Sequence, residues 1–161
     1  MRGELAVWAA QYEVIVLEGC DGAGKTTVAS RLASGCGYAL VHSGRTPDGA
    51  DLAERYRAIL RRPGKLVLDR SFVSELVYGP LRYGGSRLSV TEAIALASIV
   101  AERNGVIVHL AASPEEIAAR LRLRDGRPPA LQEIRDLLDA YKRVFTALAE
   151  AVPIITMTPT A

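Results

Sequence analysis

The sequence predicts an α/β fold in which one five-stranded parallel sheet is covered by helices on both faces. Three observations lead to this prediction. Short apolar segments rich in β-branched residues recur along the whole chain, and amphipathic segments separate them. The apolar segments show no alternation with polar residues, which is typical of strands buried on both sides. A glycine-rich turn joins the first of them to the next amphipathic segment.

The first half of the chain is expected to contain three strands, at residues 13–19, 38–43 and 65–69. Helices are expected after the first two strands. One begins at Lys25 and extends to about residue 34, where Gly35 and Gly37 end it. Asp51 caps the other, and Glu54 completes its capping box.

The second half repeats the alternation. Ser89 and Glu92 form a capping box that begins a helix, and Asn104 and Gly105 end that helix after about Arg103. Apolar residues then recur at three- and four-residue steps near the C-terminus, which predicts an amphipathic helix. The remaining elements are expected as a strand at 106–112, a helix from 113, this amphipathic helix over 130–149 and a strand at 153–157.

Length and composition indicate one globular domain spanning residues 1–161. The 20 basic and 18 acidic residues are too evenly balanced to favour stable binding to nucleic acid or to a membrane. Cys20 and Cys36 have neither a metal-binding spacing nor a disulfide framework, so we expect free thiols in a reducing compartment. The apolar run near the N-terminus is interrupted by Glu4 and is too brief for a signal peptide or a membrane span. These observations predict a cytoplasmic protein.

The glycine-rich turn, Gly19 to Thr26, matches the phosphate-loop pattern G-x-x-x-x-G-K-[ST] and lies between a strand and a helix, as its mechanism requires. Glycines let several backbone N–H groups converge on a triphosphate at the helix N-terminus. Lys25 would reach the terminal phosphates, and the Thr26 hydroxyl would bind Mg²⁺. A three-layer P-loop fold is therefore predicted, with ATP bound by Gly22, Ala23, Gly24, Lys25, Thr26 and Thr27.

Asp69 follows directly on the third apolar strand, and Arg70 comes next. Ligands of open parallel sheets bind beyond the carboxyl ends of the strands. A carboxylate at this place suits the Mg²⁺ shell beside a phosphate loop. A planar guanidinium beside it suits a bidentate hold on a second phosphate.

Taken together, EGCDGAGKTT and DRSFVSELVYG resemble the thymidylate kinases, within the group that also contains the deoxynucleoside kinases. The residues Asp69, Arg70, Ser74 and Tyr78 match the family pattern in register. The resemblance implies a fold of the nucleoside monophosphate kinase type and a homodimer. At three positions the chain departs from the pattern: Ser71, Val77 and Gly79 stand where the family has Tyr, Ala and Gln.

The resemblance implies transfer of the γ-phosphoryl of Mg-ATP to a deoxynucleoside monophosphate, with dTMP favoured. Asp21 would turn its carboxylate away from the converging N–H groups and toward a sugar hydroxyl of the acceptor. The implied catalytic residues are Lys25, Asp69, Arg70 and Arg124, the metal ligands Thr26 and Asp69, and the acceptor-binding residues Asp21, Arg45, Arg70, Ser74 and Tyr78.

The segment RLRLRDGRPP places Arg120, Arg122, Arg124 and Arg127 close together, at a helix end and in the loop after it. We expect a lid over about 120–129 that brings guanidinium groups to the transferring phosphoryl. Arg120 is assigned to ATP and Arg124 to catalysis. The alternative is a solvated face in an arginine-rich chain. Thymidylate kinases carry this arginine either in the phosphate loop or in the lid, and Gly22 occupies the loop position here.

Two other functions remain open. A deoxynucleoside or polynucleotide 5′-hydroxyl kinase would fit Asp69-Arg70-Ser71, but it needs a carboxylate base after the second strand, where Arg45 stands. A non-enzymatic nucleotide-binding module would need only the phosphate loop. His42 and His109 are interpreted as hydrogen-bonded structural residues, because a phosphate acceptor is already ionised and needs little help from a base.

Overall fold

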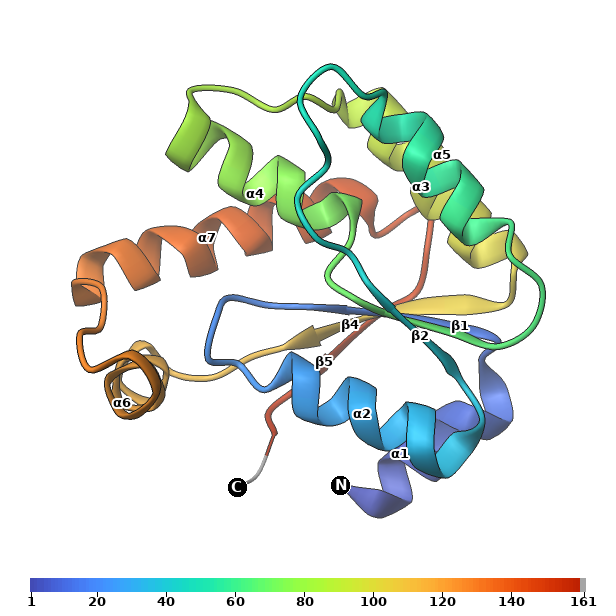
Figure 1. Ribbon diagram of the computed structural model, residues 1–161, viewed down its shortest axis with the longest axis horizontal. Helices are drawn as coiled ribbons and strands as arrows, with labels where there is room; N and C mark the ends of the chain where they lie inside the picture. Colours follow the sequence, from blue (N-terminus) through green and yellow to red (C-terminus); the bar gives the residue numbers. More distant parts are fainter. Residues whose placement is uncertain (160–161) are drawn as a thin grey trace.

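The computed structural model describes residues 1–159 and confirms the predicted α/β fold (Figure 1). Every pair of neighbouring strands is parallel, and the five strands lie in the order β2-β3-β1-β4-β5. The strands are β1 (Val14–Glu18), β2 (Ala39–His42), β3 (Leu66–Asp69), β4 (Gly105–Leu110) and β5 (Ile154–Met157). Each lies within the range expected for it or within one residue of that range.

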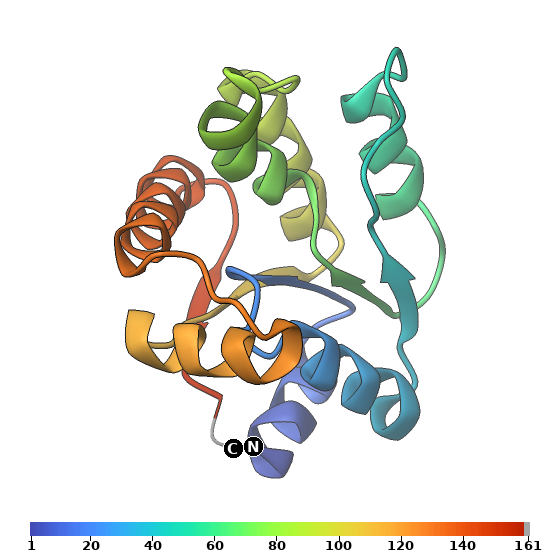
Figure 2. The ribbon, with the colours of Figure 1, turned by 60° about the vertical axis from the view of Figure 1, so that its left-hand side comes forward.

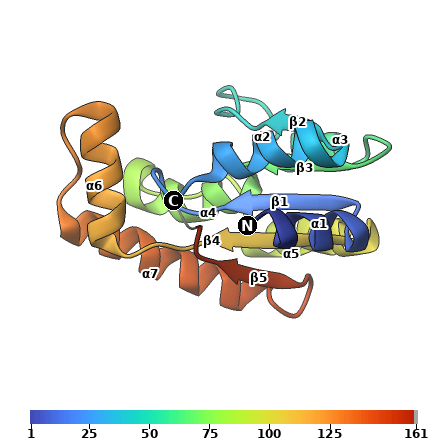
Figure 3. The same cartoon turned by 90° about the horizontal axis from the view of Figure 1, so that it is seen from below.

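Helices cover both faces of the sheet, which gives three layers (Figures 1 and 2). They are α1 (Arg2–Gln11), α2 (Lys25–Cys36), α3 (Leu52–Leu60), α4 (Phe72–Tyr83), α5 (Val90–Glu102), α6 (Pro114–Asp125) and α7 (Leu131–Leu148). One face carries α1 and α2, and the other carries α3, α4, α5 and α7. In Figure 3, α6 stands beyond the carboxyl ends of the strands.

The strands are continuously apolar because each of their faces has its own core. Ile15 and Leu17 of β1 pack in the core beneath α1 and α2, whereas Val14 and Val16 pack in the core shared with α3, α4, α5 and α7. All four are fully buried. Because the side chains within the strands are buried, we expect functional side chains at the strand ends.

Two helices were not predicted. In α1 only Leu5 and Trp8 are buried, so its apolar pattern is too weak to recognise. In α4 the sequence carries Pro80 within the helix, which is a helix-breaking signal. The helix forms nevertheless, because α4 packs against α7 and α5. The Ser71 hydroxyl also caps it by accepting a hydrogen bond from the Val73 amide.

The expected helix ends are confirmed in most cases. The capping box of Ser89 and Glu92 is present in full. Asp51 accepts a hydrogen bond from the Glu54 amide, but the Glu54 carboxylate pairs with Arg57, so only half of that predicted box forms. The helix α2 continues through Gly35 and ends at Gly37, whose φ of 77° is left-handed.

Among residues 1–159, none of the helices has the length and apolar character needed to cross a bilayer.

Candidate active site

A cleft of about 970 Å³ lies at the carboxyl ends of the strands. It is bounded by the phosphate loop, the ends of β2 and β3, the length of α4 and the last turns of α6. Figure 2 views these elements from the side of α6. Its lining includes residues of both the phosphate loop and α4.

The backbone of the phosphate loop is shaped by three glycines with positive φ. The φ angles are 148° at Gly19, 83° at Gly22 and 98° at Gly24. A Cβ at Gly19 would lie 2.5 Å from the Leu110 carbonyl oxygen, so no larger residue fits there. The Ala23 amide donates to the Cys20 carbonyl at 3.1 Å, and Ala23 is fully buried, so it supports the loop from inside rather than lining the cleft.

Lys25 begins α2 and lies folded against the loop. Its Nζ donates to the carbonyl oxygens of Gly19 at 2.7 Å and Cys20 at 2.9 Å. Burial lowers the pKa of this ammonium, while the nearby Glu18 carboxylate opposes the shift. The side chain lines the cleft, and its expected contact with the phosphates of ATP stays a prediction.

Thr26 and Asp69, the two expected metal ligands, are in direct contact. The Thr26 hydroxyl donates to Asp69 Oδ2 at 3.0 Å, and Asp69 is buried at the end of β3. His42 Nδ1 lies 3.4 Å from the same oxygen. Within residues 1–159 there is no cluster of three or more His, Cys, Asp or Glu side chains suited to a metal. Two oxygen ligands from the protein suit Mg²⁺, which takes its other ligands from water and substrate phosphates.

Asp21 and Arg70 form an ion pair, and both residues line the cleft. Arg70 has a φ of 70°, a left-handed conformation that residues other than glycine seldom adopt. This conformation turns its guanidinium toward the loop and places it 5.6 Å from the centre of the Tyr78 ring. That Asp21 faces away from the converging N–H groups stays a prediction.

Another part of the cleft lining comes from α4 and the loop after β2. Tyr78 is among these residues, and its buried hydroxyl has no hydrogen-bond partner among the residues that the structure describes. Arg45 also lines the cleft, where it pairs with Asp48 at 3.2 Å and lies over the Tyr83 ring at 5.2 Å. Ser74 lines the cleft too, but its hydroxyl donates to Glu18 Oε2 at 2.9 Å.

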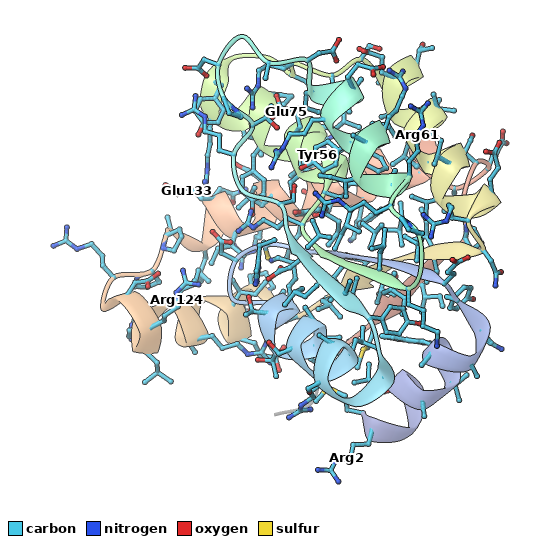
Figure 4. The ribbon with its side chains drawn as sticks, turned by 45° about the vertical axis from the view of Figure 1, so that its right-hand side comes forward. Arg2, Tyr56, Arg61, Glu75, Arg124 and Glu133 are labelled. Atoms are coloured by element: carbon cyan, nitrogen blue, oxygen red, sulfur yellow. The ribbon has the colours of Figure 1, made fainter. Side chains whose placement is uncertain are left out.

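Two of the four lid arginines reach the cleft. Arg120 and Arg124 line it, whereas Arg122 and Arg127 are not among its lining residues. Arg120 Nη1 donates to the Gly22 carbonyl at 3.1 Å, and Arg124 pairs with Asp125 at 2.7 Å. Residues four apart share a face of a helix, which explains why these two point the same way. Figure 4 shows Arg124 on α6 and, on the other side, Tyr56 and Glu75 from α3 and α4.

The same architecture recurs in solved structures. No family model matches the chain, and no curated protein is similar enough to count as a match. The YorR protein of Bacillus subtilis, in complex with phosphorylated GDP, is 24% identical over 90% of this chain and 85% of its own, with a TM-score of 0.78. The deoxyadenosine kinase of M. mycoides with bound dCTP is 14% identical over 90% of this chain and 89% of its own, with a TM-score of 0.58. The shikimate kinase of Acinetobacter baumannii in complex with shikimate is 21% identical over 98% of this chain and 88% of its own, with a TM-score of 0.53.

The chain has the fold of the P-loop kinases. At these identities the likeness describes the fold alone.

Arg82 and Arg87 also line the cleft, although neither was expected there from the sequence. Arg82 lies 4.5 Å from the centre of the Tyr78 ring, and Arg87 pairs with Glu75 and donates to the Thr46 carbonyl. Recognition of α4 as a helix would have identified Arg82, because Tyr78 and Arg82 are four residues apart on it. Arg87 lies in the segment before α5 and shows no such spacing signal.

The two histidines differ in environment. His42 is largely exposed and lines the cleft beside Asp69, so it belongs to the site rather than to the structural core. His109 is buried against the rings of Tyr141 and Phe145, and its Nε2 has no hydrogen-bond partner among the described residues. Burial lowers the pKa of His109 to about 4. His109 is therefore structural, as expected, but without the expected hydrogen bond at Nε2.

Proposed function

We propose that the protein is an Mg²⁺- and ATP-dependent phosphotransferase whose acceptor is a deoxynucleoside monophosphate, with dTMP favoured. The observation that carries this proposal is the single cleft that joins Lys25 and Thr26 of the phosphate loop to Arg70 and Tyr78. A donor phosphate chain and an acceptor phosphate would meet at Arg70, beside the loop. A protein catalyses phosphoryl transfer mostly by positioning the two substrates in this way and by stabilising the charge between them.

The charge of the cleft supports two anionic substrates. Its lining contains seven Lys or Arg side chains and only three Asp or Glu side chains. An Mg-ATP complex carries about two negative charges, and a nucleoside monophosphate carries roughly two more near neutral pH. The excess of cations matches the combined charge of these two substrates.

Each part of the transfer has a group in the cleft. Lys25 would leave the Gly19 and Cys20 carbonyls and hold the terminal phosphates of ATP. Thr26 and Asp69 would hold Mg²⁺, which neutralises charge on the phosphates. Arg70 would hold the acceptor phosphate and Arg124 would stabilise the transferring group from α6. Asp21, on the other side of Arg70, would accept a hydrogen bond from the sugar.

Two of the structures that share the fold were solved with nucleotides, phosphorylated GDP in YorR and dCTP in deoxyadenosine kinase. These ligands support a nucleotide in the cleft. The third holds shikimate, so the fold does not choose the acceptor. The choice of a nucleoside monophosphate depends on the residues of this chain, above all Arg70 and Tyr78.

A deoxynucleoside or polynucleotide 5′-hydroxyl kinase is the second candidate. Asp69-Arg70-Ser71 and the likeness to deoxyadenosine kinase favour it. A hydroxyl acceptor needs a carboxylate base, and the loop after β2 places Arg45 in the cleft where that base would be expected. A phosphate acceptor needs no such base, which favours the first candidate.

Release of ADP from Mg-ATP across a panel of acceptors tests the proposal. The panel contains nucleosides, nucleoside monophosphates, 5′-hydroxyl oligonucleotides and shikimate. We expect turnover with one or more deoxynucleoside monophosphates. Turnover confined to hydroxyl acceptors would establish the second candidate instead, and the absence of any acceptor-dependent turnover would indicate a nucleotide-binding module.

A further inference from the structure

We infer that Glu18 is a positioning residue that holds Arg70 in its left-handed conformation and so aims the Arg70 guanidinium at the acceptor. This inference depends on the proposed function for the role of Arg70, but its structural part does not. Glu18 ends β1, directly before the phosphate loop, and is the one charged residue of that strand.

The Glu18 carboxylate is fully buried and engaged by both oxygens. Oε1 accepts from the Ser71 amide at 2.8 Å, the Ser71 hydroxyl at 2.8 Å and the Ser74 amide at 3.3 Å. Oε2 accepts from the Ser74 hydroxyl at 2.9 Å and the Tyr141 hydroxyl at 3.1 Å. The two amides belong to the start of α4, so the carboxylate also accepts from N–H groups of a helix N-terminus, and it shares the Ser74 amide with the Ser71 carbonyl.

A buried carboxylate is costly unless it is well hydrogen-bonded. Burial raises the pKa of Glu18, whereas the Ser71 and Ser74 hydrogen bonds and the charges of Lys25 and Arg70 lower it. All the groups in hydrogen-bond contact with the carboxylate can donate, which suits the ionised form. An apolar side chain would pack in the core at this position without that cost. A carboxylate here therefore indicates a role that requires a hydrogen-bond acceptor.

That role follows from what lies on either side of Arg70. The Arg70 amide donates to the Leu17 carbonyl at 3.1 Å, and the next amide, that of Ser71, donates to the Glu18 side chain. Both acceptors belong to adjacent residues of β1. The backbone is therefore hydrogen-bonded to β1 both before and after the Arg70 Cα. This restricts the φ and ψ rotations of Arg70. These two bonds hold the φ of 70° and direct the side chain toward Asp21.

The same carboxylate has a second connection, to α7. The Tyr141 hydroxyl lies 3.1 Å from both Glu18 Oε2 and the Gly19 carbonyl. This contact joins α7 to the phosphate loop without involving the Ser71 amide. Tyr141→Phe therefore removes one bond to Glu18 and leaves the Arg70 side of the network intact, which makes it the matched control.

Crystal structures of Glu18→Ala, Glu18→Gln and Tyr141→Phe test the structural part without any substrate. We expect Arg70 to leave the left-handed region and lose Asp21 in Glu18→Ala. Gln offers an oxygen to the Ser71 amide and an N–H₂ group to the hydroxyls, so Arg70 should keep its conformation in Glu18→Gln. It should also keep it in Tyr141→Phe. An unchanged Arg70 in Glu18→Ala would overturn the inference, whatever the acceptor is.

Kinetics with the acceptor found by the panel test the functional part. Misplacing Arg70 should lower kcat/KM for the acceptor about 100-fold in Glu18→Ala, while the dissociation constant of ATP changes much less. Glu18→Gln should restore most of the loss. Equal losses of ATP and acceptor affinity would assign Glu18 a purely structural role and overturn the inference.

If Glu18→Ala does not fold, Glu18→Asp replaces it in both tests. Its shorter side chain keeps a carboxylate at the strand end but draws it away from the Ser71 amide. The same selective loss for the acceptor is expected, and wild-type kinetics with Arg70 unmoved would again overturn the inference. If the unaltered protein turns over no acceptor, the proposed function fails, and the conformation of Arg70 in the variants still decides the role of Glu18.

Discussion

Asp21 of the phosphate loop and Arg70 after β3 form an ion pair within the cleft, and each side chain is about one-third exposed. The pair explains why an anion-binding loop carries a carboxylate. In the proposed function, Asp21 would orient Arg70 toward the acceptor and leave the N–H groups of the loop to ATP. An acceptor phosphate would share or replace Asp21 as the partner of Arg70.

Asp21→Ala should raise the KM of the acceptor about tenfold and that of ATP much less. The change removes both the proposed sugar contact and the group that orients Arg70. Asp21→Asn keeps a hydrogen-bond acceptor without the charge. Its KM for the acceptor should lie between that of the wild type and that of Asp21→Ala. Steady-state kinetics with each substrate varied in turn measures the difference, and an equal rise of both KM values would contradict the proposed placement of the acceptor.

Lys25→Ala should lower kcat by about 10²–10³-fold with the fold retained, because no other ammonium lines the cleft beside the phosphate loop. The matched control is Lys142→Ala, since Lys142 is exposed on α7 and lies outside the cleft. ADP release and circular dichroism check the two expectations together. A Lys25→Ala variant with full turnover would remove the phosphate loop from the mechanism.

Asp69→Asn should raise the Mg²⁺ concentration needed for half-maximal activity. The carboxylate oxygen that accepts from Thr26 is replaced by an amide, which is a much weaker ligand for a hard cation. Titration of activity with Mg²⁺ at saturating ATP measures the shift. Asp48→Asn is the control, because Asp48 is exposed and, within residues 1–159, forms its ion pair with Arg45 and has no contact with Thr26. An unchanged Mg²⁺ requirement in Asp69→Asn would exclude Asp69 as a metal ligand.

Arg124→Ala should lower kcat by about tenfold or more, whereas Arg122→Ala should leave it close to wild type. Both arginines lie on α6, but only Arg124 lines the cleft. The pair of variants separates a catalytic guanidinium from the general charge of the lid. Equal effects would favour the alternative, a solvated arginine face that acts only through its total charge.

Acidification should destabilise the fold through His109. Its pKa is lowered to about 4 in the folded protein, so between about pH 6.5 and pH 4 the unfolded chain binds the additional proton. Stability is therefore lost as the pH falls, by about 2 kcal/mol between pH 7 and pH 5 from this residue. Urea unfolding at the two pH values should show a smaller loss in His109→Phe than in the wild type. An equal loss in both would show that His109 titrates normally.

Much of the architecture could be predicted from local patterns. The strands are short and apolar throughout. The phosphate loop is a contiguous motif in which the local turn places Gly19, Gly22 and Gly24 at positive φ. The spacing of Arg120 and Arg124 follows from the helix repeat alone. The helix α4 could not be predicted in this way, because Pro80 signals a break that packing against its neighbours overrides.

The sequence by itself therefore determined the sheet, the phosphate loop and the side of the sheet on which the site lies, since these depend on local spacing and on the parallel order of strands. Only the tertiary structure decided which side chains meet. Asp21 forms an ion pair with Arg70, and Glu18 accepts hydrogen bonds from Ser71, Ser74 and Tyr141. These partners are separated by 49 residues or more along the chain, so no local pattern encodes their contact. Their meeting results from the parallel pairing of β1 with β3 and the packing of α4 and α7 over the same face.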